Sequence, residues 1–197
     1  KFVLKPPGSM RSWLFVKAMQ IFPSKISGSY DEKMGLDEKD TYLALEQGLR
    51  NITIEPESIL DICTGTGAAA IEAARVFPSS RIEGVDQAEE MLDIARGKVH
   101  DLDIKNIAFT FGNAMELEYD DASFILVITS NAPVYLSEAA RILKPGGMIL
   151  IAFSFGGNAF ENLCNDAARY FGRSGIEMTD INIIGNGAYA IGKKEGK

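Results

Sequence analysis

The 197-residue sequence predicts an α/β fold built on a doubly wound, mostly parallel sheet. A short apolar run at 59–62 leads through a glycine turn into an alanine-rich helical segment, the order of a strand–turn–helix unit. The run at 148–154 is almost wholly apolar, as in a parallel strand buried on both faces. Near the C-terminus, Asn-Gly joins the apolar runs 176–184 and 188–192, which is the signal of an antiparallel hairpin.

The glycine turn predicts where a ligand binds. Gly65 and Gly67 have no Cβ atom, so the backbone can turn tightly there and approach a ligand closely. Asp86 closes the next strand, about 20 residues beyond the glycines. In a Rossmann-like unit an acid at this place holds a ribose, because a carboxylate can accept two hydrogen bonds from a vicinal diol. The sequence therefore predicts a nucleoside-bearing ligand between the turn and Asp86.

Two cofactors fit the glycine spacing. Segment 65–70, Gly-Thr-Gly-Ala-Ala-Ala, satisfies the loose dinucleotide fingerprint with Ala in third place, so NAD stays an alternative. Asp61 favours the other cofactor, because a carboxylate at the strand end repels a pyrophosphate but attracts a ligand with an ammonium and a sulfonium group. S-adenosylmethionine carries both groups, and we expect it to be the cofactor.

Segment 61–67 resembles motif I of the class I S-adenosylmethionine-dependent methyltransferases. The resemblance extends to Gly-Asn-Ala at 112–114 and to Lys-Pro-Gly-Gly at 144–147. The Tyr-Asp segment at Tyr30 is similar to that of the ubiquinone/menaquinone-type C-methyltransferase group. The resemblance implies a Rossmann-like, mostly parallel seven-stranded sheet with a C-terminal antiparallel hairpin and an N-terminal helical cap. It also implies methyl transfer to a small-molecule acceptor by in-line displacement.

The chain departs from the family pattern at three places. Asn113 stands where relatives carry an acid that accepts a hydrogen bond from the adenine amino group, although an amide oxygen can still accept that bond. Ile125 stands where relatives commonly have Asp, and the connection before Lys144 is shorter than usual. These departures leave open a cofactor-binding protein without transferase activity. The NAD-dependent oxidoreductase is the third alternative, and Asp61 and the Lys-Pro-Gly-Gly turn argue against it.

The resemblance implies roles for individual residues. Asp61 and Gly65 would hold the amino-acid end of the cofactor, Asp86 its ribose and Asn113 its adenine, while Tyr30 would close over the methionine end. The cofactor-binding residues expected on this basis are Tyr30, Asp61, Cys63, Thr64, Gly65, Gly67, Asp86, Gln87, Met91, Asn113, Ala114 and Ser130. No catalytic residue and no metal ligand is assigned, because holding donor and acceptor at reacting distance can supply most of the acceleration.

The N-terminal region and two later residues are candidates for the acceptor side. We expect residues 1–50 to form a helical cap or lid on a core domain at 51–197. Within the cap, segment 9–22 reads as a helix with a wide apolar arc, which would pack on the cleft or on a second copy in a homodimer. Contact with a membrane surface is a less favoured reading of the same arc. Asn131 and Tyr135 follow the fourth strand, where an acceptor binds in an open α/β sheet.

Composition narrows the partners and the compartment. The formal charge is −7, with 27 acidic against 20 basic residues, which disfavours nucleic acid as a partner because nucleic-acid binding depends on Lys and Arg. The two cysteines make no metal-binding or disulfide spacing, so a reducing cytoplasm is expected. No apolar run approaches the roughly 20 residues that cross a bilayer.

Overall fold

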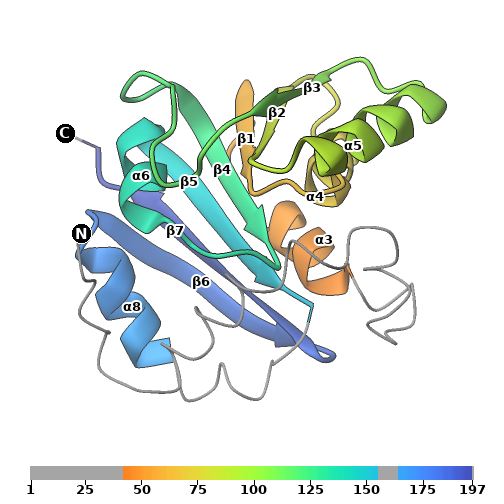
Figure 1. Cartoon of the computed structure of the whole chain (residues 1–197). Coiled ribbons are helices and arrows are strands. Elements are labelled where there is room, and N and C mark those ends of the chain that lie inside the picture. The colour runs from red at the N-terminus through yellow and green to blue at the C-terminus, as the bar shows by residue number, and fades with distance from the viewer. Residues whose placement is uncertain (1–41, 155–163, 197) are drawn as a thin grey trace. The chain divides into compact units, whose positions relative to one another are not determined.

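A computed structural model describes residues 42–154 and 164–196. Within them the chain forms a seven-stranded sheet in the order β3-β2-β1-β4-β5-β7-β6 (Figure 1). The first five strands pair in parallel, and β7 runs antiparallel to both of its neighbours. The strands are β1 (Ser58–Ile62), β2 (Arg81–Asp86), β3 (Ile107–Phe111), β4 (Phe124–Ser130), β5 (Leu143–Phe153), β6 (Ile176–Ile184) and β7 (Gly187–Lys194). The predicted mostly parallel sheet with a terminal hairpin is confirmed.

Helices cover both faces of this sheet. Helices α3, α4 and α5 lie on one face, and α6 and α8 lie on the other (Figure 1). Their bounds are α3 (Leu43–Arg50), α4 (Ala68–Val76), α5 (Glu89–Asp101), α6 (Leu136–Ile142) and α8 (Cys164–Gly172). Among these described helices none is long and apolar enough to cross a bilayer. The helix expected at 9–22 and the candidate Tyr30 lie outside the described residues.

Two hydrophobic clusters, one on each face of the sheet, hold the layers together. On one face Leu45 and Leu49 of α3 pack with Ile59 of β1. On the other face Leu136 of α6 packs with Leu60 of β1. Successive residues of a strand point to opposite faces, so Asp61 belongs to the same face as Ile59, under α4. Burying an apolar side chain such as Leu45 or Leu60 contributes roughly 1.5–3 kcal/mol to folding.

The spacing of apolar residues in segment 87–102 predicts a helix with Met91, Leu92, Ala95, Val99 and Leu102 facing the sheet. Helix α5 confirms most of this face. Leu92, Ala95 and Val99 are buried against the sheet side, as expected. Leu102, expected on the same face, is 51% exposed, and that expectation is wrong. Leu102 is the first residue after the helix, and its N–H still donates to the carbonyl oxygen of Lys98 at 3.0 Å, so it continues the last turn without being covered.

Candidate cofactor-binding site

The carboxyl ends of neighbouring parallel strands bring the predicted site residues to one edge of the sheet. Asp61 near the end of β1 pairs in register with Gly84 of β2, and Asp86 ends β2 itself. The glycine turn follows β1 and is fastened to β2, because the N–H of Thr64 donates to the carbonyl oxygen of Val85 at 3.0 Å. Ligands of open α/β sheets bind at this edge. The structure therefore brings the two acids and the turn together.

Asp86 shapes the turn as well as closing its strand. Its Oδ2 accepts a hydrogen bond from the backbone N–H of Gly65 at 2.9 Å. Its Oδ1 accepts one from the N–H of Ala88, just before α5, at 3.0 Å. Each carboxylate oxygen has further acceptor capacity, so both remain able to accept a hydroxyl. The geometry fits a ribose diol.

Asp61 has one satisfied and one unsatisfied oxygen. Its Oδ2 accepts hydrogen bonds from the hydroxyl of Thr64 at 2.6 Å and from the N–H of Ala70 in the first turn of α4 at 3.1 Å. Its Oδ1 is buried and has no hydrogen-bond partner in the part of the chain that the structure describes. Burial, with a smaller effect from Asp86, raises the pKa of Asp61 from 3.8 to about 7. A cationic group beside a buried acceptor of this kind would favour its ionised form.

The two glycines of the turn are needed for different reasons. Both have positive φ, 54° at Gly65 and 80° at Gly67. A Cβ on Gly67 would lie 2.9 Å from Cζ of Phe109, so this glycine permits close packing inside the protein. A Cβ on Gly65 would meet no atom within 4 Å. Gly65 therefore leaves open space beside Asp86, which is where a ligand can approach the backbone.

Asn113 forms the turn that follows β3. Its Oδ1 accepts a hydrogen bond from the N–H of Met115 at 3.0 Å, and its carbonyl oxygen accepts one from the N–H of Glu116 at 3.0 Å. The turn is tied to β2 because the N–H of Gly112 donates to the carbonyl oxygen of Asp86 at 2.9 Å. The amide oxygen thus has a structural partner and a second lone pair with which to accept from a base.

The remaining candidates in the described residues lie around this edge. Cys63, in the turn, has φ of 58°, and burial together with the two acids raises the pKa of its thiol from 9.0 to about 12. It stays a neutral thiol near pH 7. Met91 is half-buried in the first turn of α5, and Gln87 is exposed between β2 and α5. Ala114 is buried, and Ser130 is half-buried at the end of β4.

Asn131, expected on the acceptor side, is bound to the neighbouring strand. It has φ of 52°, and its Nδ2 donates to the hydroxyl of Ser154 at 2.9 Å. Its Oδ1 accepts a hydrogen bond from the N–H of Ser154 at 2.8 Å. The side chain therefore joins the ends of β4 and β5. Tyr135 is half-buried and precedes α6.

Three residues at this edge were missed by sequence reasoning. Phe111 and Met115 are 61% and 60% exposed on either side of the Asn113 turn, and they offer apolar surface suited to a flat base. Lys98 of α5 donates a hydrogen bond to the hydroxyl of Thr66 in the glycine turn at 2.9 Å. The spacing of these residues in the sequence gives no signal of such placements, because each depends on which elements meet.

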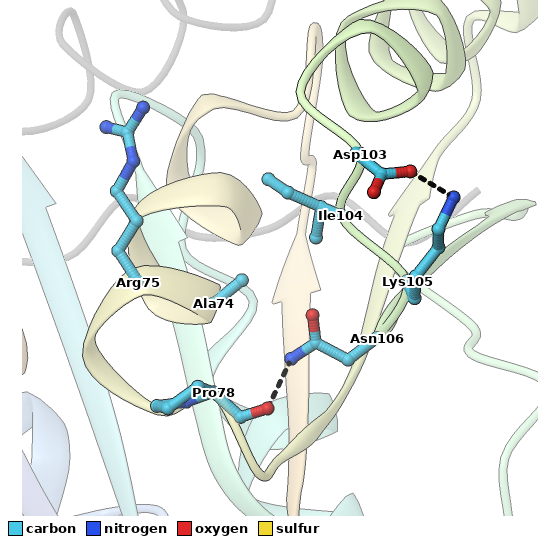
Figure 2. A pocket seen from close by; sticks show the side chains of 7 residues that line it. All are labelled: Ala74, Arg75, Pro78, Asp103, Ile104, Lys105 and Asn106. Carbon is cyan, nitrogen blue, oxygen red and sulfur yellow. Dashed lines mark hydrogen bonds and ion pairs between the residues drawn. The ribbon is translucent and has the colours of Figure 1, made fainter.

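A separate pocket of about 330 Å³ lies at the opposite edge of the sheet (Figure 2). It lies between the end of α4 and the segment that enters β3, near the amino ends of β2 and β3. The Nδ2 of Asn106 donates to the carbonyl oxygen of Pro78 at its rim. Its lining residues are Ala74, Arg75, Pro78, Asp103, Ile104, Lys105 and Asn106. None of these is a candidate cofactor ligand, so this pocket is distinct from the site at the carboxyl edge.

Comparisons with known proteins agree with this geometry. Residues 59–147 match the family described as a methyltransferase domain. A demethylmenaquinone methyltransferase from Lactococcus lactis subsp. lactis is 42% identical over 101 residues, which cover 47% of this chain and 40% of that protein. One from Bacillus mycoides is 34% identical over 136 residues, which cover 64% of this chain and 57% of that protein. The chain thus spans about half the length of the curated relatives it matches.

A solved structure shows the same fold. The crystal structure of a SAM-dependent methyltransferase from Aquifex aeolicus matches with a TM-score of 0.65 at 18% identity, covering 87% of this chain and 97% of that one. The matched segment, 59–147, contains the glycine turn, both acids and the Asn113 turn. These similarities do not favour an NAD-dependent oxidoreductase. Over residues 59–147 the chain is therefore similar to methyltransferase domains, and its fold is the one seen in an S-adenosylmethionine-dependent methyltransferase.

Proposed function

We propose that this protein transfers a methyl group from S-adenosylmethionine to a small-molecule acceptor. The unsatisfied Oδ1 of buried Asp61 is the observation that carries the proposal most directly. An isolated buried carboxylate is costly, and the cost falls when a cation lies beside it. A dinucleotide offers a pyrophosphate near the glycine turn and would add like charge. A sulfonium cofactor with an ammonium group offers the charge that Asp61 lacks.

Each part of the cofactor has a candidate partner. Asp61 and Gly65 hold the amino-acid end, Asp86 binds the ribose, and Asn113 and Ala114 border the adenine. Further contacts come from Cys63, Thr64, Gly67, Gln87, Met91 and Ser130, and Tyr30 closes over the methionine end. When bound, the cofactor supplies a methyl group on a sulfonium, which is a good leaving group. The protein residues orient that group and keep water away from it, so we assign no general base.

We propose a quinol-like aromatic acceptor as the first to test. The relatives from Lactococcus lactis and Bacillus mycoides are both named demethylmenaquinone methyltransferases. We further propose that the part of residues 1–50 that precedes α3 forms a cap, since Leu45 and Leu49 of α3 pack in the core, and that the protein works in the cytoplasm. Transient membrane contact through that cap, and a homodimer, are extensions of the same proposal. The net charge of −7 supports a small molecule rather than nucleic acid as the acceptor.

Titration calorimetry tests the cofactor before the acceptor is known. We expect S-adenosylmethionine and S-adenosylhomocysteine to bind and NAD to give no heat. Asp61→Asn is the matched variant, because its amide oxygen can take the two hydrogen bonds that Oδ2 accepts while its NH₂ group lies where Oδ1 was. It should fold and bind the adenosyl ligands much more weakly. Binding of NAD alone would overturn the proposal.

Turnover is then measured as mass gain of an acceptor. The protein is incubated with S-adenosylmethionine and a reduced demethylnaphthoquinone, and a gain of one methyl group is expected. Catechol and glycine serve as acceptors of other chemical classes. Cofactor binding without transfer to any acceptor would favour a binding protein without transferase activity, the alternative that Ile125 and Asn113 raise.

A further inference from the structure

Two side chains of α6 bind the backbone of the segment between β3 and β4. Oε2 of Glu138 accepts a hydrogen bond from the N–H of Leu117 at 3.0 Å. Nη2 of Arg141 donates to the carbonyl oxygen of Leu117 at 2.9 Å, and its Nη1 donates to that of Tyr119 at 2.7 Å. Glu138 and Arg141 also bind each other at 2.9 and 3.1 Å. One ion pair therefore satisfies both backbone groups of Leu117.

This segment is the continuation of the Asn113 turn. At its start, the N–H of Gly112 donates to the carbonyl oxygen of Asp86. At its end, Leu117 is held by Glu138 and Arg141. The turn at 113–116 is therefore anchored twice, once on the residue proposed to bind the ribose and once on α6.

Helix α6 holds this segment through directional hydrogen bonds, in addition to apolar packing. The Leu117 side chain is buried, and the hydrophobic effect that favours its burial is non-directional. Three hydrogen bonds to N–H and carbonyl groups fix the position and orientation of that backbone. The two side chains are 21% and 30% exposed, so solvent partly screens the ion pair between them. Their hydrogen bonds act locally, on the position of this backbone.

We propose that Glu138 and Arg141 are positioning residues that set the adenine-side turn, 113–116, relative to Asp86. They act through Leu117 and Tyr119 and do not touch the cofactor. The inference rests on the proposed function, because the adenine is placed beside this turn only there. If the turn moves while Asp86 stays, base contacts and ribose contacts no longer fit one ligand. Affinity and discrimination between bases should then change together.

The test compares two arginines that each form an ion pair with the glutamate three residues earlier. Arg141→Met keeps most of the side-chain stem and removes every donor. Arg75→Met is the control, because Arg75 also pairs with a glutamate three residues earlier, Glu72, but lies at the end of α4 by the opposite edge of the sheet. Calorimetry gives the affinity of each variant for S-adenosylhomocysteine and for S-inosylhomocysteine, in which a carbonyl oxygen replaces the adenine amino group.

We expect Arg141→Met to weaken S-adenosylhomocysteine binding about five- to tenfold, the scale of residues that modulate a site without contacting its ligand. The ratio of the two affinities should fall toward one, whereas Arg75→Met should leave both affinities unchanged. Arg141→Lys should be intermediate, because one ammonium cannot serve both carbonyl groups in the same geometry. This second variant keeps the test decisive if Arg141→Met does not fold.

Two results would overturn the inference. One is an unchanged affinity and ratio in Arg141→Met. The other is equal weakening for both ligands with the ratio preserved, which indicates a purely structural role. Failure of the wild-type protein to bind S-adenosylhomocysteine would instead overturn the proposed function itself, so the two failures are distinguishable.

Discussion

The carboxylate of Asp86 accepts a hydrogen bond from the backbone N–H of Gly65 at 2.9 Å, although 21 positions separate the two residues in the chain. The residue proposed to bind the ribose therefore also fixes the turn proposed to receive the amino-acid end. Ligand binding and turn geometry cannot be changed independently at this position.

Replacement of Asp86 should weaken both roles together. Asp86→Ala removes the acceptors for Gly65 and Ala88, and we expect cofactor affinity to fall more than tenfold, because interactions with charged groups contribute about 1.5–3 kcal/mol each. Asp86→Asn keeps one acceptor and should be intermediate. Calorimetry with S-adenosylhomocysteine measures both variants, and Asp101→Ala, on an exposed side chain, is the control. Unchanged affinity in Asp86→Ala would exclude the ribose assignment.

Two glycines allow a matched test of the turn. Gly65 has φ of 54° and Gly185, in the β6–β7 turn, has φ of 57°, and a Cβ on either would meet no atom within 4 Å. Replacement by Ala should therefore cost both variants about the same stability, roughly 1–2 kcal/mol from the left-handed backbone. Thermal unfolding checks this equality.

Only one of the two variants should lose ligand binding. In Gly65→Ala the new methyl group lies in the open space beside Asp86, so binding of S-adenosylhomocysteine should become undetectable or nearly so. In Gly185→Ala calorimetric affinity should equal that of the wild type. Equal affinities in the two variants would show that the cofactor does not approach the backbone at Gly65.

The buried carboxyl of Asp61 predicts a pH dependence of stability. Its pKa is raised from 3.8 to about 7, so between these values the folded protein holds a proton that the unfolded chain has lost. The stability linked to this group is complete below about pH 4 and is lost as the pH rises through 7. Compared with wild type, Asp61→Asn should gain relative stability over that window, at most about 4 kcal/mol. Denaturant unfolding at pH 5 and pH 8 gives the difference, and a gain that is equal at both values would contradict the prediction.

Cofactor binding should release that proton. A cation beside Oδ1 favours the ionised carboxylate, and Asp86 and the neutral Cys63 thiol are the nearby groups coupled to it. Near pH 6, wild-type binding heats should therefore differ between buffers of different ionisation enthalpy by an amount that corresponds to release of part of one proton. Asp61→Asn removes this group, so any binding that remains should show no such dependence. Buffer-independent heats in the wild type would show that Asp61 does not change its protonation state.

The hydrogen bonds between Asn131 and Ser154 predict how substitutions at Asn131 change the stability of the protein. Asn131→Gly keeps the left-handed backbone but loses both hydrogen bonds to Ser154, and it should destabilise the protein by about 1–3 kcal/mol. Asn131→Ala adds backbone strain at φ of 52° and should be less stable still. Thermal unfolding ranks the variants, with Ser154→Ala losing the bond from Nδ2 and keeping the bond from its own N–H to Oδ1. A glycine variant as stable as the wild type would mean that the bridge between β4 and β5 contributes nothing.

Local patterns determined most of the fold. The apolar run at 59–62, the glycines and the alanine-rich helix predicted a strand–turn–helix unit because each is set by neighbours within a few residues. The hairpin was predicted for the same reason, but its two-residue turn is Gly185-Asn186, because Gly187 already pairs with Ile184 as the first residue of β7. Gly185 has the positive φ that a type II′ turn requires at its first central position. Leu102 was predicted on the buried face of α5 but is exposed, because helical spacing does not indicate how far along a helix that face stays covered.

For the candidate site, too, part could be predicted from the sequence and part depends on tertiary contacts. The sequence by itself predicted Asp61, Gly65 and Asp86 as site residues, because residue type and spacing suit a nucleoside site, and the structure brings Gly65 and Asp86 into contact. Only the tertiary structure decided that Oδ1 of Asp61 is unsatisfied and that the Asn131 side chain binds Ser154. It also decided that Arg141 binds the backbone carbonyl groups of Leu117 and Tyr119. These contacts join segments that are distant in sequence, so their partners are fixed by how the sheet and its helices pack.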